Sequence, residues 1–360
     1  MKTLLKTTIK ITMLILICNC LNGCAKTETV KDFSPKRLFE FAERGDFPER
    51  VIYTDGIWNV ERINYKGHSI SVGSDIENTE VIYENDAGYR NRITANGRCI
   101  AWAEWGIGEI QDEVHLKIYD KKTNEIKNYY TLPGDGSMED GRQYGKVWLF
   151  DNLIYFYIRD YKKNVVEYYR YNIDSEEIEL FDKATITYYT DELMNVSGES
   201  LLYFKNPIDG KGVICNLNIN TGEAKDIILP QKVDELFSVV YDKANNSYII
   251  YYGDSEANKY KIGRFHNKDK EIEELHTMSR ESWVWEEVYD SELSVHNHYV
   301  LWVQKQYTVP RYALMAMNMD TKELYMFEGG FSFGIAGDDI YCLTRDGDWY
   351  PGLYKLNIEG

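Results

Sequence analysis

The sequence predicts an all-β fold: a single β-propeller of six to seven four-stranded blades, with seven favoured, preceded by a short N-terminal helix. Polar turns of similar spelling end in Glu125, Glu177, Glu223, Glu271 and Glu323, so successive turns lie 52, 46, 48 and 52 residues apart. Strand-length apolar runs rich in Tyr, Ile, Val and Phe fill the intervals. An all-β repeat of nearly fifty residues is the signature of propeller blades.

The N-terminal 23 residues have the features of a signal peptide. Three lysines precede the apolar run Ile11–Cys18, which is too short to cross a bilayer as a stable helix. The following Leu21-Asn22-Gly23-Cys24 resembles the lipobox that bacterial lipoprotein peptidases cut. This resemblance implies that Cys24 becomes a lipidated mature N-terminus; the alternative is an ordinary secretory signal cut nearby. We therefore expect an extracytoplasmic protein anchored to the bacterial cell membrane by an N-terminal lipid.

Charge and cysteine content exclude several classes of protein. The formal net charge is −17, and residues 1–23 carry three Lys and no Asp or Glu, so the mature chain has −17 − 3 = −20. A body this acidic repels nucleic acid, because each phosphate contact needs a cation. Beyond Cys24 only Cys99, Cys215 and Cys342 remain, each inside an apolar run. We expect buried thiols, with neither a disulfide framework nor a CxxC site.

The mature chain divides into a tether, a lead-in and one large domain. Residues 24–33 form the lipidated cysteine and a polar tether. Residues 34–49 are expected to form the short helix and lead-in, because Ser34-Pro35 offers an N-cap with Pro at the first helical position and Gly45 ends the apolar face. Residues 50–360 form the propeller.

The apolar runs after residue 50 are the basis for the predicted number of blades and for the way in which the ring is expected to close. Runs such as Leu153–Ile158 and Tyr299–Val303 are almost continuously apolar, which indicates burial on both faces, as in stacked blades. Trp58–Tyr83 lies in a region long enough for a further blade, which favours seven. The C-terminal unit supplies only about three strands, so we expect Val51–Tyr53 or Ile57–Ile63 to complete it.

The repeat resembles that of bacterial TolB-type and WD40-like propellers across most of the mature chain. The similarity lies in the pattern, because the Gly-His and Trp-Asp signatures of WD40 blades and the Ser-x-Asp-x-Gly-x-Thr-Trp box of sialidase propellers are missing. The resemblance therefore implies an architecture and no specific activity.

The variable loops on the side opposite the repeated turns are the expected binding face. Several place aromatic rings, which can stack on a sugar, beside carboxylates, which can accept hydroxyl hydrogen bonds. The alternative is that these rings merely cover blade ends. The candidate ligand-binding residues are Trp105, Glu109, Asp112, Tyr161, Trp283, Trp285, Asp346, Asp348, Trp349 and Tyr350.

Two groups of residues are candidate metal ligands, although we expect no cofactor. The loop at 133–141 could hold Ca²⁺ through Asp135, Glu139 and Asp140, but it lacks EF-hand spacing and a solvated loop is the alternative. His296 and His298, at i and i+2, should share one face of a strand and could begin a metal site, with no third ligand visible.

These observations favour a surface-tethered binding protein over an enzyme. We expect a carbohydrate, a peptide or a partner protein on the loop-rich face, and contact with the membrane through the lipid alone. The alternative is a propeller enzyme, a glycan hydrolase or lyase with carboxylates, histidines or a metal at the channel mouth. The sequence contains no H-E-x-x-H, G-x-S-x-G or phosphate-binding glycine loop. A third possibility is a scaffold for assembly.

Overall fold

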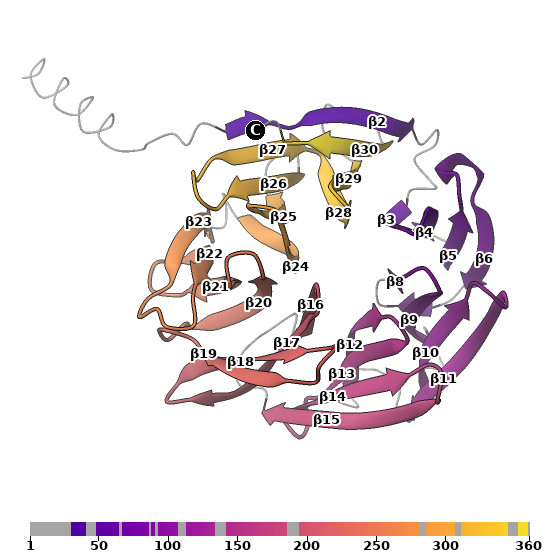
Figure 1. The fold of residues 1–360 in the computed structure, drawn as a ribbon, viewed down its shortest axis with the longest axis horizontal. Helices are drawn as coiled ribbons and strands as arrows, with labels where there is room; N and C mark the ends of the chain where they lie inside the picture. The colour runs from indigo at the N-terminus through magenta and orange to yellow at the C-terminus, as the bar shows by residue number, and fades with distance from the viewer. Residues whose placement is uncertain are drawn as a thin grey trace, which may run out of the picture.

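The chain forms a ring of seven antiparallel blades around a central axis (Figure 1). The computed structural model describes residues 30–40, 48–64, 67–85, 88–90, 93–106, 113–133, 142–185, 194–280, 286–306, 311–344 and 352–358. The all-β prediction and the favoured count of seven blades are confirmed. Among the described residues, no helix has the length and apolar character needed to cross a membrane.

Within each blade the strands follow one another from the axis toward the rim, and the blades are numbered here in chain order. Blade 1 contains β3 (Pro48–Thr54), β4 (Ile57–Asn64), β5 (Gly67–Gly73), the short 3-10 helix η1 (Ile76–Asn78) and β6 (Glu80–Asn85). Blade 2 contains β7 (Gly88–Arg90), β8 (Thr94–Ala95), β9 (Cys99–Gly106), β10 (Glu113–Asp120) and β11 (Glu125–Pro133), and both β7 and β8 pair with β9.

The middle of the chain forms three regular blades. Blade 3 contains β12 (Arg142–Phe150), β13 (Leu153–Asp160), β14 (Val165–Asn172) and β15 (Glu177–Thr185). Blade 4 contains β16 (Met194–Ser197), β17 (Ser200–Ile208), β18 (Lys211–Asn218) and β19 (Ala224–Ile228). Blade 5 contains β20 (Glu235–Asp242), β21 (Ser247–Asp254), β22 (Lys259–Phe265) and β23 (Glu273–Ser279).

The last two blades include strands from both ends of the chain. Blade 6 contains β24 (Glu286–His296), β25 (Tyr299–Gln306), β26 (Tyr312–Asn318) and β27 (Leu324–Glu328), with β1 (Val30–Asp32) added parallel to β27. Blade 7 contains β28 (Gly330–Ala336), β29 (Asp339–Thr344), β30 (Gly352–Asn357) and, at its outer edge, β2 (Ser34–Glu40).

An N-terminal strand closes the ring, although a different one from those expected. β2 runs antiparallel to β30, with Ser34 opposite Asn357 and Glu40 opposite Gly352. The segments Val51–Tyr53 and Ile57–Ile63 instead belong to β3 and β4 of blade 1. The N-terminal part of the chain is therefore long enough to supply both a complete first blade and the closing strand.

The predicted helix at 34–49 is wrong where the structure describes it, because Ser34–Glu40 is a strand. The local pattern satisfied helix rules, but β30 presents an unpaired edge, and pairing with that edge overrides local propensity. Pro35 is compatible with this position because β2 is an edge strand, where a missing N–H can face solvent.

Three of the repeated turns owe their similarity to one hydrogen-bond pattern. Asn218 Oδ1 accepts from the backbone N–H groups of Asn220 and Thr221, and Asn172 and Asn318 make the same pair of bonds in their own turns. The fifth residue of each turn has a positive φ, which glycine adopts without strain and which Gly222 provides in blade 4. The side chain of one residue thus dictates the turn locally, and the turn recurs in the sequence.

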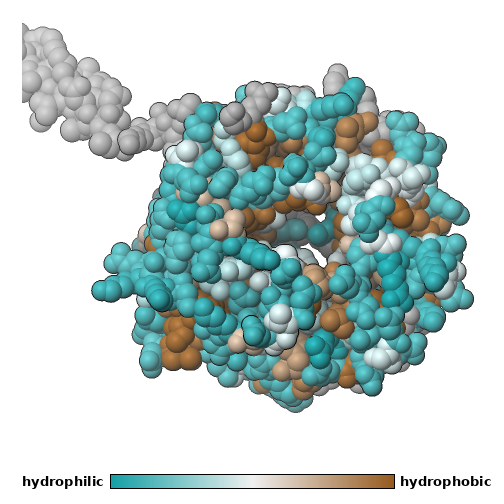
Figure 2. Space-filling model, viewed as in Figure 1, coloured by the Kyte–Doolittle hydropathy of each residue, from teal (hydrophilic) through white to brown (hydrophobic). Residues whose placement is uncertain are grey.

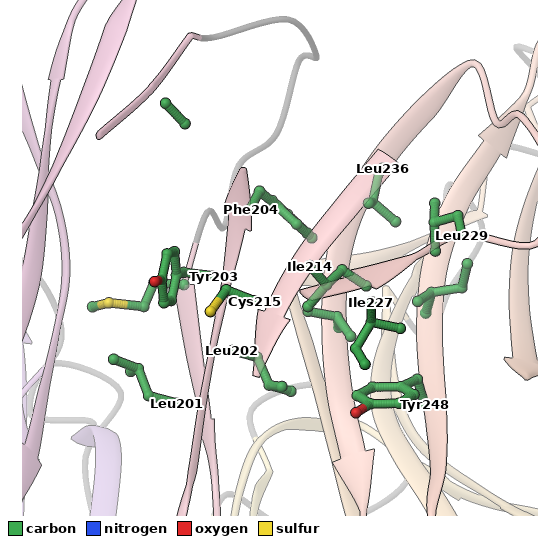
Figure 3. Packing of buried hydrophobic residues seen from close by; sticks show 14 of the residues in the cluster. Leu201, Leu202, Tyr203, Phe204, Ile214, Cys215, Ile227, Leu229, Leu236 and Tyr248 are labelled. Atoms are coloured by element: carbon green, nitrogen blue, oxygen red, sulfur yellow. The ribbon is translucent and has the colours of Figure 1, made fainter. Parts of the chain in front are cut away.

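The hydrophobic core lies between neighbouring blades. In blade 4, Leu201, Tyr203 and Cys215 face one neighbouring blade while Leu202 and Ile214 face the other (Figure 3). Alternate side chains of β17 are therefore buried on opposite faces, which confirms the prediction that these continuously apolar strands are buried on both faces. The three cysteines beyond Cys24 are buried free thiols, as predicted.

Candidate functional site

The central channel contains a cavity of about 260 Å³ lined by the inner strands of six blades. Figure 2 shows the opening at the centre of the ring, with polar and apolar residues around it. The lining residues come from β3, β8, β12, β16, β24 and β28, with Tyr341 from β29. No single segment of the sequence forms this site, because each of the six blades contributes only one to five residues.

The cavity lies toward the end of the channel where tight turns join the first two strands of each blade. Tyr53 is the penultimate residue of β3, and Ala95 and Ala336 are the last residues of β8 and β28. The expected binding face is at the opposite end, where the longer loops lie. The described part of the chain therefore reveals a second candidate site, one that sequence reasoning did not find.

An ion pair spans the cavity between two blades that are not neighbours. Arg50 Nη2 on β3 of blade 1 lies 3.4 Å from Glu292 Oε1 on β24 of blade 6, past the inner end of blade 7. Their side chains are 16% and 19% exposed. Glu292 lies in an irregular part of β24, where the register with β25 shifts between Val288 and Leu293. A bulge of this kind re-aims a side chain, here into the channel lining.

Aromatic rings form the apolar part of the lining. Tyr53 and Tyr341 both line the cavity and pack with Trp58, whose ring centroid lies 4.5 Å from that of Tyr53 and 5.3 Å from that of Tyr341. Phe333 and Trp148 complete this set. Together these rings offer flat apolar surfaces beside a charged pair.

Side chains from one blade hold the inner strand of the next, which fixes the channel wall. Inner strands are edge strands, so some of their backbone groups lack a ladder partner. The Leu149 N–H donates to Thr94 Oγ1 at 3.3 Å, and Trp148 Nε1 donates to the Met194 carbonyl at 3.2 Å. Asn195 Nδ2 similarly donates to the Val239 carbonyl at 3.1 Å. These bonds link blades 2 to 5 and orient the Trp148 indole.

A second cluster of polar side chains lies between blades 1 and 2. The Glu104 carboxylate accepts hydrogen bonds from Lys117 Nζ at 2.7 Å, from the Tyr83 hydroxyl at 2.7 and 2.8 Å, and from Trp102 Nε1 at 3.2 Å. Burial opposes ionisation, but these hydrogen bonds and the charge of Lys117 outweigh it and lower the pKa of Glu104. Because its partners keep the Glu104 carboxylate ionised, Glu104 and Lys117 form a structural ion pair, and Glu104 would be a poor proton donor.

Blade 6 repeats this cluster without the charges. Trp302 and Gln304 occupy the places of Trp102 and Glu104, and Trp302 Nε1 lies 3.4 Å from Gln304 Oε1. His276 from blade 5 packs against Trp302 with ring centroids 5.2 Å apart. Burial lowers the pKa of His276 to about 4, so the imidazole is neutral near pH 7. The repeated Trp-x-Glu/Gln pattern was a visible signal for this pair of clusters.

Most candidate residues of the loop-rich face lie outside the described residues. These are Glu109, Asp112, Trp283, Trp285, Asp346, Asp348, Trp349 and Tyr350, and for calcium Asp135, Glu139 and Asp140. Cys24 and the signal peptide lie outside them too, and Trp105 is described only in its backbone, within β9. Tyr161 is described: the residue is 42% exposed, and Arg159 Nη1 donates to its hydroxyl at 3.3 Å. The aromatic platform and the calcium loop remain predictions.

The two histidines do not share one face of a strand, so that expectation is wrong. His296 ends β24, whereas His298 lies in the following turn and pairs with Asp320, Nδ1 to Oδ2, at 3.5 Å. Within the described residues, no group of three or more His, Cys, Asp or Glu side chains could hold a metal ion.

The channel lining lacks a pair of carboxyl groups in the part that the structure describes. Glycoside hydrolysis generally requires two carboxyl groups about 5–10 Å apart. Glu292 is the one acidic residue among the described residues that line the cavity, and Arg50 is its partner. The geometry of the described cavity thus suits binding, and the enzyme alternative would require the loop-rich end.

Comparison with known proteins shows the fold. No protein-family model matches the chain, and neither does any curated protein sequence. The β-propeller domain of the Trilobed protease from Pyrococcus furiosus matches at 9% identity over 88% of this chain and 96% of that chain, with a TM-score of 0.58. Virginiamycin B lyase from Staphylococcus aureus matches at 12% identity over 91% and 100% of the two chains, with a TM-score of 0.52. The fold is a β-propeller.

A third similar structure is TolB from Acinetobacter baumannii, at 12% identity and a TM-score of 0.45. The match covers 72% of this chain and spans 59% of the TolB chain. At identities this low, likeness to solved propellers concerns architecture alone, because unrelated functions share the fold.

Proposed function

We propose that this protein is a ligand-binding β-propeller, anchored outside the cell membrane by a lipid on Cys24, that takes its ligand in the central channel. The observation that carries the proposal is the cavity of about 260 Å³, which combines aromatic rings with one partly buried ion pair. Small-molecule sites are typically concave and mostly apolar, with a few placed polar groups that set orientation. The hydrogen bonds between successive inner strands favour binding because they preform the wall.

The N-terminal geometry supports a short tether. Val30 pairs with Leu324 at the outer edge of blade 6, and only five residues separate Val30 from Cys24. At about 3.3–3.6 Å per residue, the lipid would lie within about 20 Å of this edge. The ring would therefore be held close to the bilayer, with no further membrane contact needed.

Blocking the channel tests the binding site. The mature chain carrying Cys24→Ser is titrated with a panel of amino acids, short peptides and sugars. Ala336→Trp places a bulky ring in the cavity lining, whereas Ala257→Trp adds the same ring to an exposed turn of blade 5. We expect Ala336→Trp to abolish binding and Ala257→Trp to preserve it. Binding that survives Ala336→Trp would place the ligand elsewhere and reject the proposal.

The lipid anchor is tested separately in cells. Cys24→Ala should remove acylation and release the protein from the membrane fraction, while Cys20→Ala, a control within the same signal region, should leave both unchanged. A Cys24→Ala protein that stayed acylated and membrane-bound would contradict the anchor.

A further inference from the structure

Strand β1 shows how this propeller extends a blade by an added strand. It lies parallel to β27 at the outer edge of blade 6, with Val30 opposite Leu324. Lys31 Nζ lies 2.6 Å from Oε1 of Glu323, the residue just before β27, and 5.5 Å from the centre of the Tyr325 ring. The added strand therefore combines backbone pairing with a lysine whose charge meets a carboxylate at the start of the outer strand.

Blade 3 has an equivalent outer edge, to which no strand is added in the part of the chain that the structure describes. β15 is the last strand of its sheet, and Figure 1 shows it at the outer rim, far around the ring from β27. The turns before β15 and β27 are equivalent, because Asn172 and Asn318 begin them with the same pair of hydrogen bonds. Glu177 and Glu323 each lie five residues after their Asn. The edge of β15, with its row of backbone groups, thus begins at the same carboxylate that Lys31 meets in blade 6.

Two apolar side chains of β15 are exposed where the equivalent part of blade 6 is buried. Ile178 and Leu180 are 38% and 40% exposed, whereas Leu324, the counterpart of Ile178, is 4% exposed. The strand itself is held in place, because Phe181 packs with Tyr203 of blade 4 at a centroid distance of 5.5 Å. Residues at i and i+2 of a strand share one face, so the two exposed side chains form one apolar surface beside the edge.

The charges along β15 favour a basic partner. Glu177 and Glu179 lie on either side of Ile178, and the whole chain has a net charge of −17. Glu179 pairs with Arg170 of the neighbouring strand, whereas Glu177 is in no ion pair among the described residues. Opposite charges across a strand pair stabilise it and like charges destabilise it. A lysine or arginine beside Glu177 would repeat the contact that Lys31 makes with Glu323.

The comparable outer strands of three other blades do not combine these features. Two residues after the corresponding glutamate, blades 2 and 4 carry Lys127 and Lys225, which would repel a basic strand. In blade 5 the apolar residue after Glu271 is Ile272, and it is 9% exposed. The exposed apolar pair and the acidic residues therefore single out blade 3 from these blades.

We propose that the edge of β15 binds an extended segment of a partner protein as a fifth strand of blade 3, parallel to β15. Apolar residues of that segment cover Ile178 and Leu180, and a lysine or arginine lies beside Glu177. In this mode of recognition, main-chain hydrogen bonds give affinity and alternate side chains give specificity. The site is separate from the channel, so it adds a second binding function and does not depend on the first.

Short peptides test the inference by fluorescence anisotropy with the mature Cys24→Ser chain. The probe is an N-acetylated peptide of six residues that alternates valine with lysine and carries a fluorophore at its C-terminus. A serine–lysine peptide keeps the charge and loses the apolar contacts, and a valine–lysine peptide with N-methyl groups on alternate residues loses backbone donors. We expect each control to bind about tenfold more weakly than the probe, and a valine–glutamate peptide not to bind.

Matched variants test the residues of the edge. Leu180→Lys and Glu177→Lys should each weaken binding of the probe about tenfold. Ile228→Lys and Glu223→Lys make the same changes at exposed residues of blade 4 and should leave its affinity unchanged. Glu177→Lys should also gain affinity for the valine–glutamate peptide, which a general loss of folding would not produce. Leu180→Ser, which adds no charge, replaces Leu180→Lys if the unfolding midpoint of the latter falls.

Hydrogen exchange locates the bound peptide. The amides of β15 should exchange more slowly when the probe is bound, and Ala336→Trp in the channel should leave its affinity unchanged. Protection confined to β27 would show that the probe had displaced β1, and loss of binding in Ala336→Trp would assign the probe to the channel; either result would overturn the inference.

Three further results would also overturn it. These are no binding of the probe at up to about 1 mM, equal affinity for the serine–lysine peptide, and self-association of the chain that Leu180→Lys abolishes, because the edge would then belong to a second copy. The channel proposal is judged by its own panel of compounds, so either proposal can fail while the other stands.

Discussion

Phe33 should stabilise the ring far more than its place near the N-terminus suggests. It lies between β1 and β2, is 4% exposed, and packs with Tyr325 at a centroid distance of 6.1 Å in a cluster that joins blades 6 and 7. Such a ring buries about 150–250 Å², which corresponds to about 4–6 kcal/mol at about 25 cal/mol per Å². Phe→Ala changes in cores cost about 3–5 kcal/mol. Because a terminal segment can detach locally, we expect the lower end for Phe33→Ala, about 3 kcal/mol.

Urea unfolding followed by tryptophan fluorescence measures this loss. With a denaturant slope of about 3 kcal/mol/M, Phe33→Ala should lower the midpoint by about 1 M. Val30→Ala, in the same segment but at a side chain that is 41% exposed, should leave the midpoint nearly unchanged. A loss below about 1 kcal/mol for Phe33→Ala would refute the reasoning, because Phe33 would then not be packed between the last two blades.

Three further predictions concern the blades themselves. Lys117→Met should destabilise the protein by about 2–4 kcal/mol in thermal or urea unfolding, because it leaves the buried Glu104 carboxylate without its cation. This loss of stability should shrink as the pH falls through the lowered pKa of Glu104, because the carboxylate is then protonated. An unchanged unfolding midpoint would show that the ion pair does not contribute to stability. Burial lowers the pKa of His276 to about 4, so the unfolded state binds a proton before the folded state does, and the free energy of unfolding should fall by up to about 3 kcal/mol as the pH drops from about 6.5 to 4. His276→Phe should flatten that part of the stability–pH profile, and a profile identical to that of the unchanged protein would contradict the assignment. Gly330→Ala should lower the free energy of unfolding by about 1–3 kcal/mol, because a Cβ there would lie 2.7 Å from Cys342 Sγ and 3.1 Å from a backbone nitrogen. Gly334→Ala in the same strand meets no atom closer than 3.4 Å and should be tolerated. Equal unfolding midpoints for the two variants would contradict the packing of β28.

The architecture could be predicted because its repeating parts are encoded locally. Asn172, Asn218 and Asn318 each form their turn with neighbours two and three residues away, so a similar turn sequence recurs in blades 3, 4 and 6. The failed helix shows the limit of this reasoning. Ser34–Glu40 pairs with a strand near the other end of the chain, and nothing in its own seven residues reports that partner.

The channel site could not be predicted, because its members are distant in sequence and individually ordinary. Arg50 and Glu292 are 242 residues apart, and the irregular register that precedes Leu293 has no sequence signature. The cluster around Glu104 is different, since Trp102-Ala-Glu104 and Trp302-Val-Gln304 stand at the same place in two repeats. Alignment of the blades against one another would have found it.

The tryptophan indole resonances test the central claim most directly. Trp148 lines the channel and donates its N–H to the Met194 carbonyl, whereas Trp302 is fully buried outside the cavity and Trp285 and Trp349 belong to the predicted loop-rich face. With ¹⁵N-labelled tryptophan, the panel compound that binds most tightly should shift the Trp148 resonance and leave that of Trp302 in place. A shift confined to Trp285 or Trp349, with Trp148 unmoved, would contradict binding in the channel and return the site to the loops.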